Sequence, residues 1–454
     1  MSLALLTDPA ALEGYARDVS GLRAVPEAVA RPESEDEVQE VVRMAAAADA
    51  CITAAGAQTS TTGASVAQRG WLLSTRAMAR ILDLDPVRRT ARVEPGVLIG
   101  DLQRACAPFG LFFAPDPTSE EECTVGGAIA CNASGPRTLR YGPTRPHVRA
   151  LTAVLADSSL FTARRPLVEK NTVGYQLAHD PVDWFVGSEG TLGVVTEAEL
   201  SLLPIPPHVL GLGVPFPDEA SALAFVVAAR ETAAVHPRCL EYFDADAFGV
   251  VRHAMDDRGW AAHAGAMVYL EEAGDGEPPL DDWLALAERF GANAGDVRAF
   301  DGEHALREAR RLRHAVPAAM HERTAPYLPH GGRRMSTDWA VPYRLAAPAL
   351  AEARRIADAH GLPPAVTYGH LGNGHPHQNF IARDPMDVKK IERALEDMLH
   401  AVIAMGGTVA AEHGIGKVKA RWLGLQSSPR QVALMVALKR LLDPDGRLAP
   451  GNIL

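Results

Sequence analysis

The residues with the clearest capacity for chemistry are three histidines that lie within eight positions, at His370, His375 and His377. They belong to a run that reads GHLGNGHPHQN, and Glu412 opens a second run, EHGIG, 35 residues after His377. Imidazoles and carboxylates are common ligands of divalent transition metals, and a set of two imidazoles and one carboxylate leaves coordination positions open. The two runs therefore predict a catalytic metal site, with zinc as the first choice.

The spacing of the histidines also predicts a bend in the chain. His370 and His377 are seven residues apart, so on one straight strand they would face opposite sides. Gly372 and Gly374 between them make a sharp turn inexpensive. The alternative interpretation, that the histidines are surface or satisfied core residues, is disfavoured by the later run that begins at Glu412.

Three glycine-rich runs in the first half of the sequence have the composition of a nucleotide-binding surface. They cover residues 56–63, 124–135 and 187–195, and the common phosphate-binding patterns GxGxxG after a strand and GxxxxGK[ST] are absent. Glycine allows backbone N–H groups to approach a pyrophosphate closely and to form an anion-binding nest. One such run is equally explained as a turn, so the order and spacing of all three carry the argument.

In this order, with VEPGV at residues 93–97 between the first two, the runs resemble the FAD-binding domain of the vanillyl-alcohol-oxidase/PCMH flavoprotein superfamily. The resemblance covers roughly residues 15 to 210 and 300 to 454. Further segments that agree are PDP at 115–117, RYG at 140–142, NTVGY at 171–175, FVGSEGTLG at 185–193 and PG at 450–451.

The resemblance implies an α+β fold with three parts. A PCMH-type FAD-binding domain of two subdomains is expected at residues 15–206. A substrate or cap domain with a central antiparallel sheet, carrying the metal site, is expected at 207–412, and a C-terminal segment at 413–454 returns to the FAD domain. The prolines at 204, 206 and 207 support the first boundary, because proline fixes φ and lacks an N–H donor.

The resemblance also implies how the cofactor is held. The first run would cradle the pyrophosphate, the second would line the ribityl and isoalloxazine parts, and Gly190 and Val195 would meet the adenine side through backbone atoms. Relatives with covalent flavin often have a histidine in the first run, whereas this chain has Gln58 there, so non-covalent FAD is expected. The residues expected at the cofactor are Gly56, Ala57, Gln58, Thr59, Ser60, Gly63, Pro115, Gly126, Gly127, Asn132, Ala133, Gly135, Tyr141, Gly142, Glu189, Gly190, Val195 and Asn452.

The second half resembles glycolate, D-lactate and D-2-hydroxyglutarate dehydrogenases, which carry a G-H-x-G-D-G-N-x-H-x-N run and a later E-H-G-[IV]-G. By this resemblance His370, His377 and Glu412 bind the metal, Asn379 contacts the substrate, and His413 is the catalytic base. The ion would bind the hydroxyl and carboxylate oxygens of the substrate and lower the hydroxyl pKa, so that His413 removes the proton. The hydride on Cα would then move to flavin N5.

The chain departs from these relatives at three positions. Asn373 and His375 replace the usual Asp and Asn, and neither is an expected ligand. Ser336 stands where the relatives carry a lysine shortly before a D-x-x-x-P segment, so Arg333 or Arg334 would have to substitute for that lysine. Because a second carboxylate needs its own cation, D-2-hydroxyglutarate is not carried over directly as the substrate.

Two other cations are candidates for the substrate carboxylate. Arg313 matches the substrate arginine of the family, and a guanidinium suits a carboxylate because it can bond bidentately. Its neighbours Arg310 and Arg311 are equally explained as a solvated helix face. Lys419 is a second candidate, for which a plain surface lysine is an equal interpretation.

The leading hypothesis is an FAD- and metal-dependent dehydrogenase of a small 2-hydroxy acid of the D-lactate or glycolate type. Electrons would pass to a quinone, a cytochrome or an electron-transfer flavoprotein rather than to NAD. One alternative is a non-redox transferase resembling alkyl-dihydroxyacetonephosphate synthase, against which the metal-binding residues argue. The other is a non-catalytic flavin-binding subunit of a larger oxidase complex. The family resemblance also implies a homodimer.

Composition narrows the class of partner and the compartment. The net charge of −11 argues against a nucleic-acid partner. No apolar run approaches the roughly 18 residues of a membrane span, and the first 30 residues resemble neither a signal nor a transit peptide. A cytoplasmic protein is therefore expected. The five cysteines lack a CxxC pattern and are expected to be reduced, mostly buried thiols.

Periodicity and turn residues predict the elements that must position these groups. A helix is expected over 34–50, with Ser34 as N-cap and Glu37 three residues later. Other helices are expected at 100–109, 218–232, 281–290 and 428–442, and strands at 51–54, 70–74, 80–84, 90–94, 151–156, 193–203 and 264–271.

Overall fold

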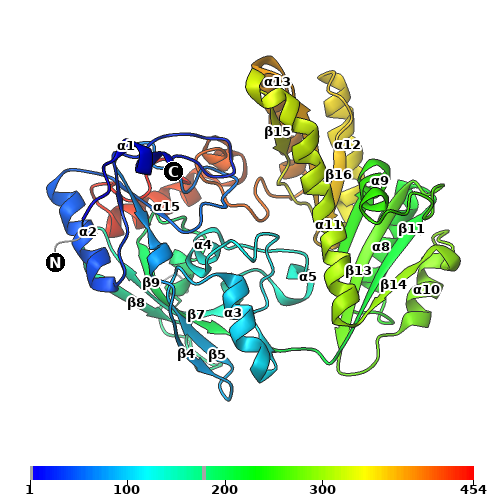
Figure 1. Cartoon of the computed structure of the whole chain (residues 1–454), viewed down its shortest axis with the longest axis horizontal. Coiled ribbons are helices and arrows are strands. Elements are labelled where there is room, and N and C mark those ends of the chain that lie inside the picture. Colours follow the sequence, from blue (N-terminus) through cyan, green and yellow to red (C-terminus); the bar gives the residue numbers. More distant parts are fainter. Residues whose placement is uncertain (1–3, 176–179) are drawn as a thin grey trace. The chain divides into compact units, whose positions relative to one another are not determined.

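The computed structural model describes residues 4–175 and 180–454, except for the side chains of residues 303, 304 and 312. The chain divides into two compact units (Figure 1). Unit 1 comprises the residues up to Gly135, Gly142–Ile205 and Glu412–Leu454, and unit 2 comprises Pro136–Tyr141 and Pro206–Ala411. Each unit mixes helices with sheets, which confirms the predicted α+β class.

Unit 1 contains a three-stranded sheet, a five-stranded sheet and a two-stranded pair of β6 and β10. The small sheet is parallel, in the order β1-β3-β2, and the larger one is antiparallel, in the order β4-β5-β9-β7-β8. Its strands are β1 (Ala28–Ala30), β2 (Ile52–Ala55), β3 (Trp71–Ser74), β4 (Ile81–Asp85), β5 (Thr90–Val93), β6 (Leu111–Phe112), β7 (Val148–Val154), β8 (Leu160–Arg164), β9 (Val194–Ser201) and β10 (Leu203–Pro204). Its helices are α1 (Pro9–Glu13), α2 (Glu35–Ala47), α3 (Ile99–Cys106), α4 (Val125–Cys131), α7 (Val182–Phe185), α14 (Leu423–Gln426) and α15 (Pro429–Leu442).

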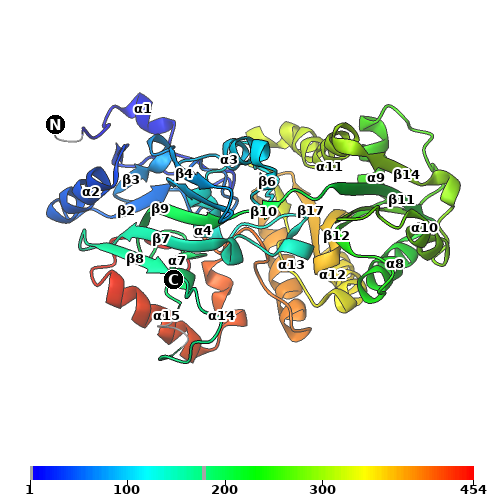
Figure 2. The ribbon, with the colours of Figure 1, turned by 90° about the horizontal axis from the view of Figure 1, so that it is seen from below.

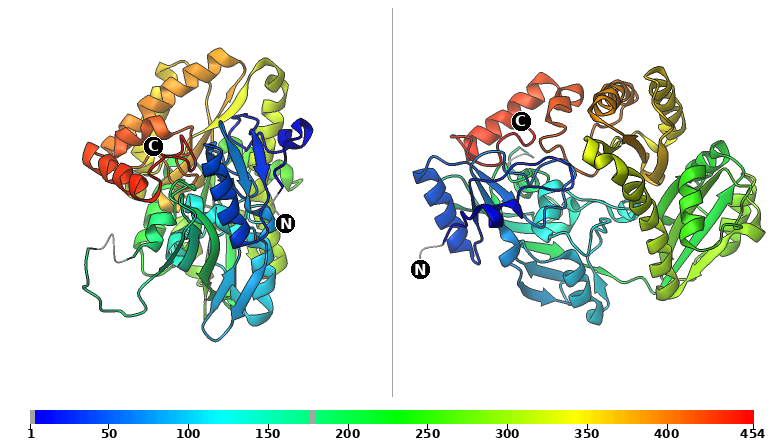
Figure 3. Two further views of the ribbon diagram at one scale, coloured as in Figure 1. Left: turned by 90° about the vertical axis from the view of Figure 1, so that its left-hand side faces the viewer. Right: turned by 45° about the horizontal axis from the view of Figure 1, so that its top comes forward.

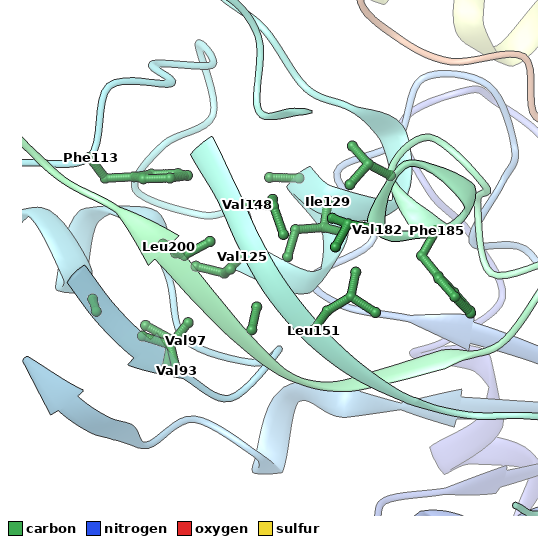
Figure 4. Packing of buried hydrophobic residues seen from close by; sticks show 14 of the residues in the cluster. Val93, Val97, Phe113, Val125, Ile129, Val148, Leu151, Val182, Phe185 and Leu200 are labelled. Carbon is green, nitrogen blue, oxygen red and sulfur yellow. The ribbon is translucent and has the colours of Figure 1, made fainter. Parts of the chain in front are cut away.

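Apolar clusters hold unit 1 together, and two of them place its helices against its sheets. In the first, Val125 and Ile129 of α4 pack against Leu151 of β7 and Leu200 of β9 (Figure 4). In the second, the apolar stripe of α2 packs against residues of both sheets, such as Leu73 and Val154. Figure 3 shows the ribbon of this helix in dark blue. Burial of these side chains contributes the main favourable free energy of the unit. It also fixes α4, which carries the second glycine-rich run.

Unit 2 is built on one antiparallel seven-stranded sheet in the order β14-β11-β13-β12-β16-β17-β15. This arrangement confirms the predicted central antiparallel sheet. The strands are β11 (His208–Phe216), β12 (Pro237–Asp244), β13 (Ala266–Gly274), β14 (Arg298–Asp301), β15 (Arg333–Ser336), β16 (Val366–His370) and β17 (His375–Ala382).

Helices cover both faces of this sheet. Helices α9 (Ala245–Ala254) and α11 (Gly302–Thr324) pack on the face that carries Phe243 and Tyr368. The other helices are α5 (Thr138–Tyr141), α8 (Glu219–Glu231), α10 (Leu280–Glu288), α12 (Ala346–Ala359) and α13 (Pro385–Ala404). Figure 2 shows α8 and α12 on the side opposite α9 and α11. We call the face under α9 and α11 the inner face.

Most of the predicted elements form within a few residues of their expected bounds. The helix predicted over 34–50 is α2, and the side chain of Ser34 caps it by accepting the N–H of Glu37. The carboxylate of Glu37 instead accepts the N–H of Glu33, so the expected capping box is only half formed. A complete box occurs at α15, between Ser428 and Gln431.

Two further sequence expectations concern the membrane and the cysteines. Within residues 4–175 and 180–454, no helix combines the length and the apolar character needed to cross a bilayer. All five cysteines are unpaired thiols, and Cys106, Cys123 and Cys239 are buried. Burial raises the pKa of the Cys106 thiol to about 11, as expected for an unreactive structural cysteine.

Candidate flavin and metal sites

The first glycine-rich run presents a row of backbone donors. In the described part of the chain, the N–H groups of residues 57–61 have no hydrogen-bond partner. Gln58 has a φ of +57°, and its side-chain amide donates to the carbonyls of Tyr15 (3.1 Å) and Ser65 (3.2 Å). Consecutive N–H groups around a left-handed residue form an anion nest, so the run suits a pyrophosphate, while the Gln58 side chain fixes the loop.

The three glycine-rich runs lie together in unit 1. A Cβ added to Gly56 would lie 2.2 Å from Oγ1 of Thr124, which caps α4, so only glycine allows this approach of the first run to the second. The N–H groups of Gly187 and Glu189 in the third run donate to carbonyls of α4, each at 2.9 Å. Segments more than 50 residues apart in sequence therefore form one surface rich in backbone groups.

The C-terminal segment ties the first run to the third. Asn452 is buried, and its amide donates to the carbonyls of Ala64 (2.8 Å) and Glu189 (3.0 Å). Its Oδ1 accepts from Nζ of Lys417 at 2.6 Å, and Nζ also donates to the carbonyl of Gly63 at 3.3 Å. Burial lowers the pKa of Lys417 to about 8. Sequence reasoning missed Lys417, whose only signal is its place directly after EHGIG.

The EHGIG run, residues 412–416, contacts all three glycine-rich runs. The carboxylate of Glu189 accepts the N–H groups of its last two residues at 2.6 and 2.7 Å. The carbonyl of His413 accepts from Oγ1 of Thr62 at 3.4 Å, and Oε2 of Glu412 accepts from Oγ of Ser134 at 3.5 Å. Burial raises the pKa of Glu189.

The other residues expected near the cofactor fall in different places. Gly135 lies where a Cβ would be 2.2 Å from the carbonyl oxygen of Asp116. Tyr141 belongs to α5 and to unit 2, whereas Gly142 resumes unit 1. Lys419 was a candidate for the substrate carboxylate, with a plain surface lysine as the equal interpretation. It is 8% exposed and its Nζ donates to the carbonyl of Gly414 at 3.1 Å, so it is not a surface lysine. Gly126, Gly127, Asn132 and Ala133 are in or directly after α4, Gly190 follows Glu189, and Val195 is in β9. Pro115 is buried, and Ala57, Thr59 and Ser60 are in the open first run.

The histidine run folds as the predicted turn. Strands β16 and β17 form an antiparallel hairpin in which His370 is the register partner of His375 and Tyr368 that of His377. Gly374 at the turn has a φ of +69°, and a Cβ there would lie 1.9 Å from the carbonyl oxygen of Val341. The hairpin therefore brings His370 and His377 to the same face of the sheet, and the predicted bend is confirmed.

All three histidine rings meet on the inner face. The ring centroids are 5.4 Å apart for His370 and His377, 5.5 Å for His370 and His375, and 4.4 Å for His375 and His377. One nitrogen from each ring lies within 4.8 Å of the others, and all three side chains are buried. Such a group of nitrogens has the spacing of a divalent-metal site.

Neighbouring groups fix which nitrogens face the cluster centre. Nδ1 of His370 lies 2.7 Å from Oε1 of Glu241, and Oε2 of Glu241 lies 3.7 Å from Nε of Arg313. Nδ1 of His377 donates to the carbonyl of Thr337 at 3.3 Å. Assigned in this way, both Nδ1 atoms carry the ring proton, and Nε2 is the unprotonated nitrogen of each ring. Arg313, expected at the substrate, thus also contacts the carboxylate that orients His370.

Glu412 is connected to this cluster through the chain. Ala411 is the last residue of unit 2, and its N–H donates to the carbonyl of Asp338 at 2.8 Å. Asp338 directly follows Thr337, whose carbonyl accepts from His377. Glu412 follows Ala411 as the first residue of the last segment of unit 1.

Comparison with known proteins identifies the family. A model described as FAD binding domain matches residues 26–164, and one described as FAD linked oxidases, C-terminal domain, matches residues 205–453. The chain belongs to the FAD-linked oxidases. This assignment confirms the resemblance expected from the motifs, and FAD is the cofactor that the first model names.

Curated relatives are similar over almost the whole length of this FAD-linked oxidase. It is 33% identical to a D-2-hydroxyglutarate dehydrogenase of Xanthomonas citri pv. viticola, over 100% of this chain and 94% of that protein. It is 30% identical to glycolate oxidase subunit GlcD of Bacillus subtilis, over 95% and 89% of the two chains. It is also 30% identical to a D-lactate dehydrogenase of Archaeoglobus fulgidus, over 94% and 90%.

Solved structures show the same fold at low sequence identity. p-Cresol methylhydroxylase with substrate bound matches with a TM-score of 0.75 and 17% identity, over 99% of this chain and 93% of that one. Alkyldihydroxyacetonephosphate synthase matches with a TM-score of 0.73 and 17% identity, over 98% and 82%. These matches confirm the PCMH-type fold of the FAD-linked oxidase.

The substrate-side candidates of the FAD-linked oxidase separate onto two faces of its sheet. Ser336 pairs with Asn379, and Arg334 with Ile381, so these side chains share the inner face with His377. Arg333 points to the other face, where its guanidinium lies 3.1 Å from Oε1 of Glu392. Asn379 is 1% exposed. Of the two arginines proposed to replace the lysine, only Arg334 therefore shares a face with the histidines.

A buried charge cluster next to this site escaped sequence reasoning. Oε2 of Glu271 lies 3.2 Å from Nε of Arg137 and 2.6 Å from the guanidinium of Arg238, and Oε1 accepts from the hydroxyl of Tyr269. Burial opposes ionisation, but the two arginines lower the pKa of Glu271 to about 2. Arg137 lies in the short segment Pro136–Tyr141, so this ion pair anchors that segment in unit 2.

Proposed function

We propose that this FAD-linked oxidase is an FAD- and metal-dependent dehydrogenase that oxidises a small 2-hydroxy acid of the D-lactate or glycolate type to the 2-keto acid. The observation that carries the proposal is the position of EHGIG. Residues 412–416 contact all three glycine-rich runs. Glu412 directly follows Ala411, whose N–H donates to the carbonyl of Asp338, and the neighbouring carbonyl of Thr337 accepts a hydrogen bond from His377. One short run thereby connects the residues proposed to hold flavin with those proposed to hold metal.

The residues of unit 1 fit FAD held without a covalent bond. The unpartnered N–H groups of residues 57–61 suit the pyrophosphate, and the close approach at Gly56 leaves no room for a side chain. Lys417 and Lys419 add two buried or partly buried cations beside the first run and EHGIG. The first run contains no histidine that could form a flavin link.

The inner face of unit 2 fits a divalent metal. Two imidazoles with unprotonated Nε2, oriented by Glu241 and Thr337, follow the usual carboxylate–histidine–metal and carbonyl–histidine–metal patterns. We propose that His370, His377 and Glu412 are ligands and that zinc is the ion. The bound metal would act as a Lewis acid on the substrate hydroxyl.

The remaining roles follow from charge and geometry. Arg313 binds the substrate carboxylate, because its fork matches two oxygens and its present partner Glu241 also contacts His370. Asn379 contacts the substrate through Oδ1, which has no hydrogen-bond partner in the described part of the chain, because its Nδ2 already donates to the carbonyls of Val366 and His377. His413, whose Nε2 lies 3.3 Å from Oε1 of Glu412, takes the hydroxyl proton. FAD supplies the acceptor for the hydride released from Cα.

The reaction needs a second acceptor to restore the flavin. The two electrons received from each hydroxy acid pass onward to a quinone, a cytochrome or an electron-transfer flavoprotein. The transferase alternative shares only the fold, since the synthase is 17% identical. Absence of substrate-dependent flavin reduction would favour the non-catalytic subunit instead.

Anaerobic spectroscopy tests this proposal directly. Purified protein should be yellow, contain stoichiometric metal and lose its flavin absorbance within seconds when D-lactate or glycolate is added. His370→Ala should keep the flavin but lose the metal and slow bleaching by at least about 10²-fold. His400→Ala, which removes an exposed histidine of α13, is the matched control. If no 2-hydroxy acid of either enantiomer bleaches the wild type, the proposed reaction is wrong.

A further inference from the structure

A third histidine, His375, lies in the same cluster as His370 and His377. Its side chain is 3% exposed, and its Nε2 has no hydrogen-bond partner in the described part of the chain. The nearest acid is Asp338, whose Oδ1 lies 3.2 Å from Nε2 but outside hydrogen-bond geometry. A buried polar atom without a hydrogen bond costs about 1–3 kcal/mol, so a missing partner is expected at this nitrogen.

The position of His375 makes a metal ion a suitable partner. Its ring is closer to His377, at 4.4 Å, than the ring of His370 is, at 5.4 Å. His375 is also the register partner of His370 and therefore points to the same face. A cation that both His370 and His377 can reach therefore lies within reach of His375 as well, given one nitrogen of each ring within 4.8 Å.

We propose that His375 is a third imidazole ligand of the metal, so that the β16–β17 hairpin supplies three nitrogen ligands by itself. This inference rests on the metal site of the proposed function and adds a ligand to it. The orphaned Nε2 supplies the lone pair, and the tight turn at Gly374 fixes the ring where its nitrogen reaches the ion. No other described side chain pairs with that nitrogen.

The third imidazole changes how the substrate reaches the metal. With three histidines and Glu412 the ion has four protein ligands, which fills a tetrahedral zinc shell. The hydroxy acid must then enter by expansion to five or more ligands, or by release of Glu412. Removal of Glu412 should therefore weaken metal binding less in this protein than in a variant with two imidazoles.

The test is a count of imidazoles by X-ray absorption on the zinc-loaded holoenzyme. The wild type should show three imidazoles, and His375→Asn should show two while keeping its flavin absorbance. Zinc affinity, measured by chelator competition, should fall by at least about tenfold in His375→Asn. Even residues that only hydrogen-bond to a metal ligand contribute about 10- to 100-fold to metal affinity. His375→Gln serves as a second variant in case the first folds poorly.

A double-mutant cycle with Glu412→Gln gives an independent readout. If His375 is a ligand, Glu412→Gln should weaken zinc binding at least about tenfold more in the His375→Asn background than in the wild type. Two imidazoles in the wild type, or unchanged zinc affinity with a lower melting temperature in His375→Asn, would show a structural pair with Asp338 and overturn the inference alone. A wild type that binds no zinc at all overturns the proposed metal site and the inference together.

Discussion

The region of unit 1 that we propose to bind flavin (the flavin region) and the region of unit 2 that we propose to bind a metal (the metal region) are built by opposite means. The flavin region of unit 1 is made of backbone groups from five parts of the sequence, joined by Asn452, Glu189 and the EHGIG run. The metal region of unit 2 is made of side chains from one hairpin, oriented by Glu241 and Thr337. The flavin region depends on close contacts between distant segments of the backbone. The metal region depends on which side-chain atoms the hairpin presents.

This difference predicts that the two sites fail independently. A change that alters backbone approach in unit 1 should remove FAD and leave the metal. A change that alters the hairpin should remove the metal and leave FAD. Four substitutions test the contrast, in order of decreasing expected effect.

Gly374→Ala should have the largest effect. At a φ of +69°, a Cβ at Gly374 would lie 1.9 Å from the carbonyl oxygen of Val341, and backbone cannot move aside as a flexible side chain can. The strain alone should cost about 1–3 kcal/mol, and the clash should add to it. We expect a lower melting temperature and loss of bound metal, with flavin absorbance retained. Gly276→Ala, where a Cβ meets nothing within 4 Å, is the control; equal metal content in the two variants would contradict the prediction.

Gly416→Ala should have the converse effect, which is weaker FAD binding with the metal retained. Its φ is +52°, and a Cβ would lie 2.3 Å from the carbonyl oxygen of Thr62 in the first glycine-rich run. A cost of about 1–3 kcal/mol corresponds to roughly 10- to 100-fold weaker FAD binding. Fluorescence titration of the apoprotein with FAD measures this, and metal content should not change. Gly424→Ala, in open space, should bind FAD normally; weaker binding in both variants would mean that the close approach is not the cause.

Glu241→Gln should weaken metal binding without removing it. The carboxylate of Glu241 holds Nδ1 of His370, and loss of such an outer partner typically costs 10- to 100-fold in metal affinity. Glu272→Gln is a matched control, because Glu272 is also a buried glutamate of the same sheet but bonds to Trp283 and His236. Chelator competition measures the metal affinity of both variants. A similar loss of affinity in each would mean that lower fold stability, and not the contact with His370, causes the loss.

Lys417→Met should change the pH dependence of stability in the apoprotein. Because the pKa of Lys417 is lowered from 10.5 to about 8 in the folded state, the unfolded state binds more protons between those pH values. Stability therefore rises with pH from about 8 to 10.5, by up to about 1.4 kcal/mol per unit. Urea unfolding at pH 7.5 and 10 should show a smaller rise in Lys417→Met than in the wild type. An unchanged rise would assign the effect to other groups.

Much of the fold and part of the site could be predicted from the sequence. Helix α2 with its Ser34 cap and the turn at Gly374 follow from local rules, because one residue type decides the backbone there. The bend that brings His370 and His377 to one face followed from their spacing and the glycines between them. These signals are local, so no tertiary information was needed.

The parts that escaped prediction depend on long-range partners. Nothing local in the sequence distinguishes Glu241, Glu271 and Arg137 from ordinary strand or loop residues. Their contacts depend on the register of β12 against β13 and β16 and on the ion pair between Arg137 and Glu271. Lys417 acquires its low pKa from burial against the C-terminal segment. His375 was not expected as a ligand because the relatives carry Asn there, although three imidazoles in eight residues were the available signal.

The order in which the chain is made gives the interleaved units a further consequence. The segment Glu412–Leu454 belongs to unit 1 but is synthesised only after all of unit 2. Until it emerges from the ribosome, the first and third glycine-rich runs lack Asn452, and Glu189 lacks the backbone donors of EHGIG. We therefore expect FAD to be bound fully only after translation, whereas the hairpin of unit 2 is complete some 30 residues before Glu412 is added.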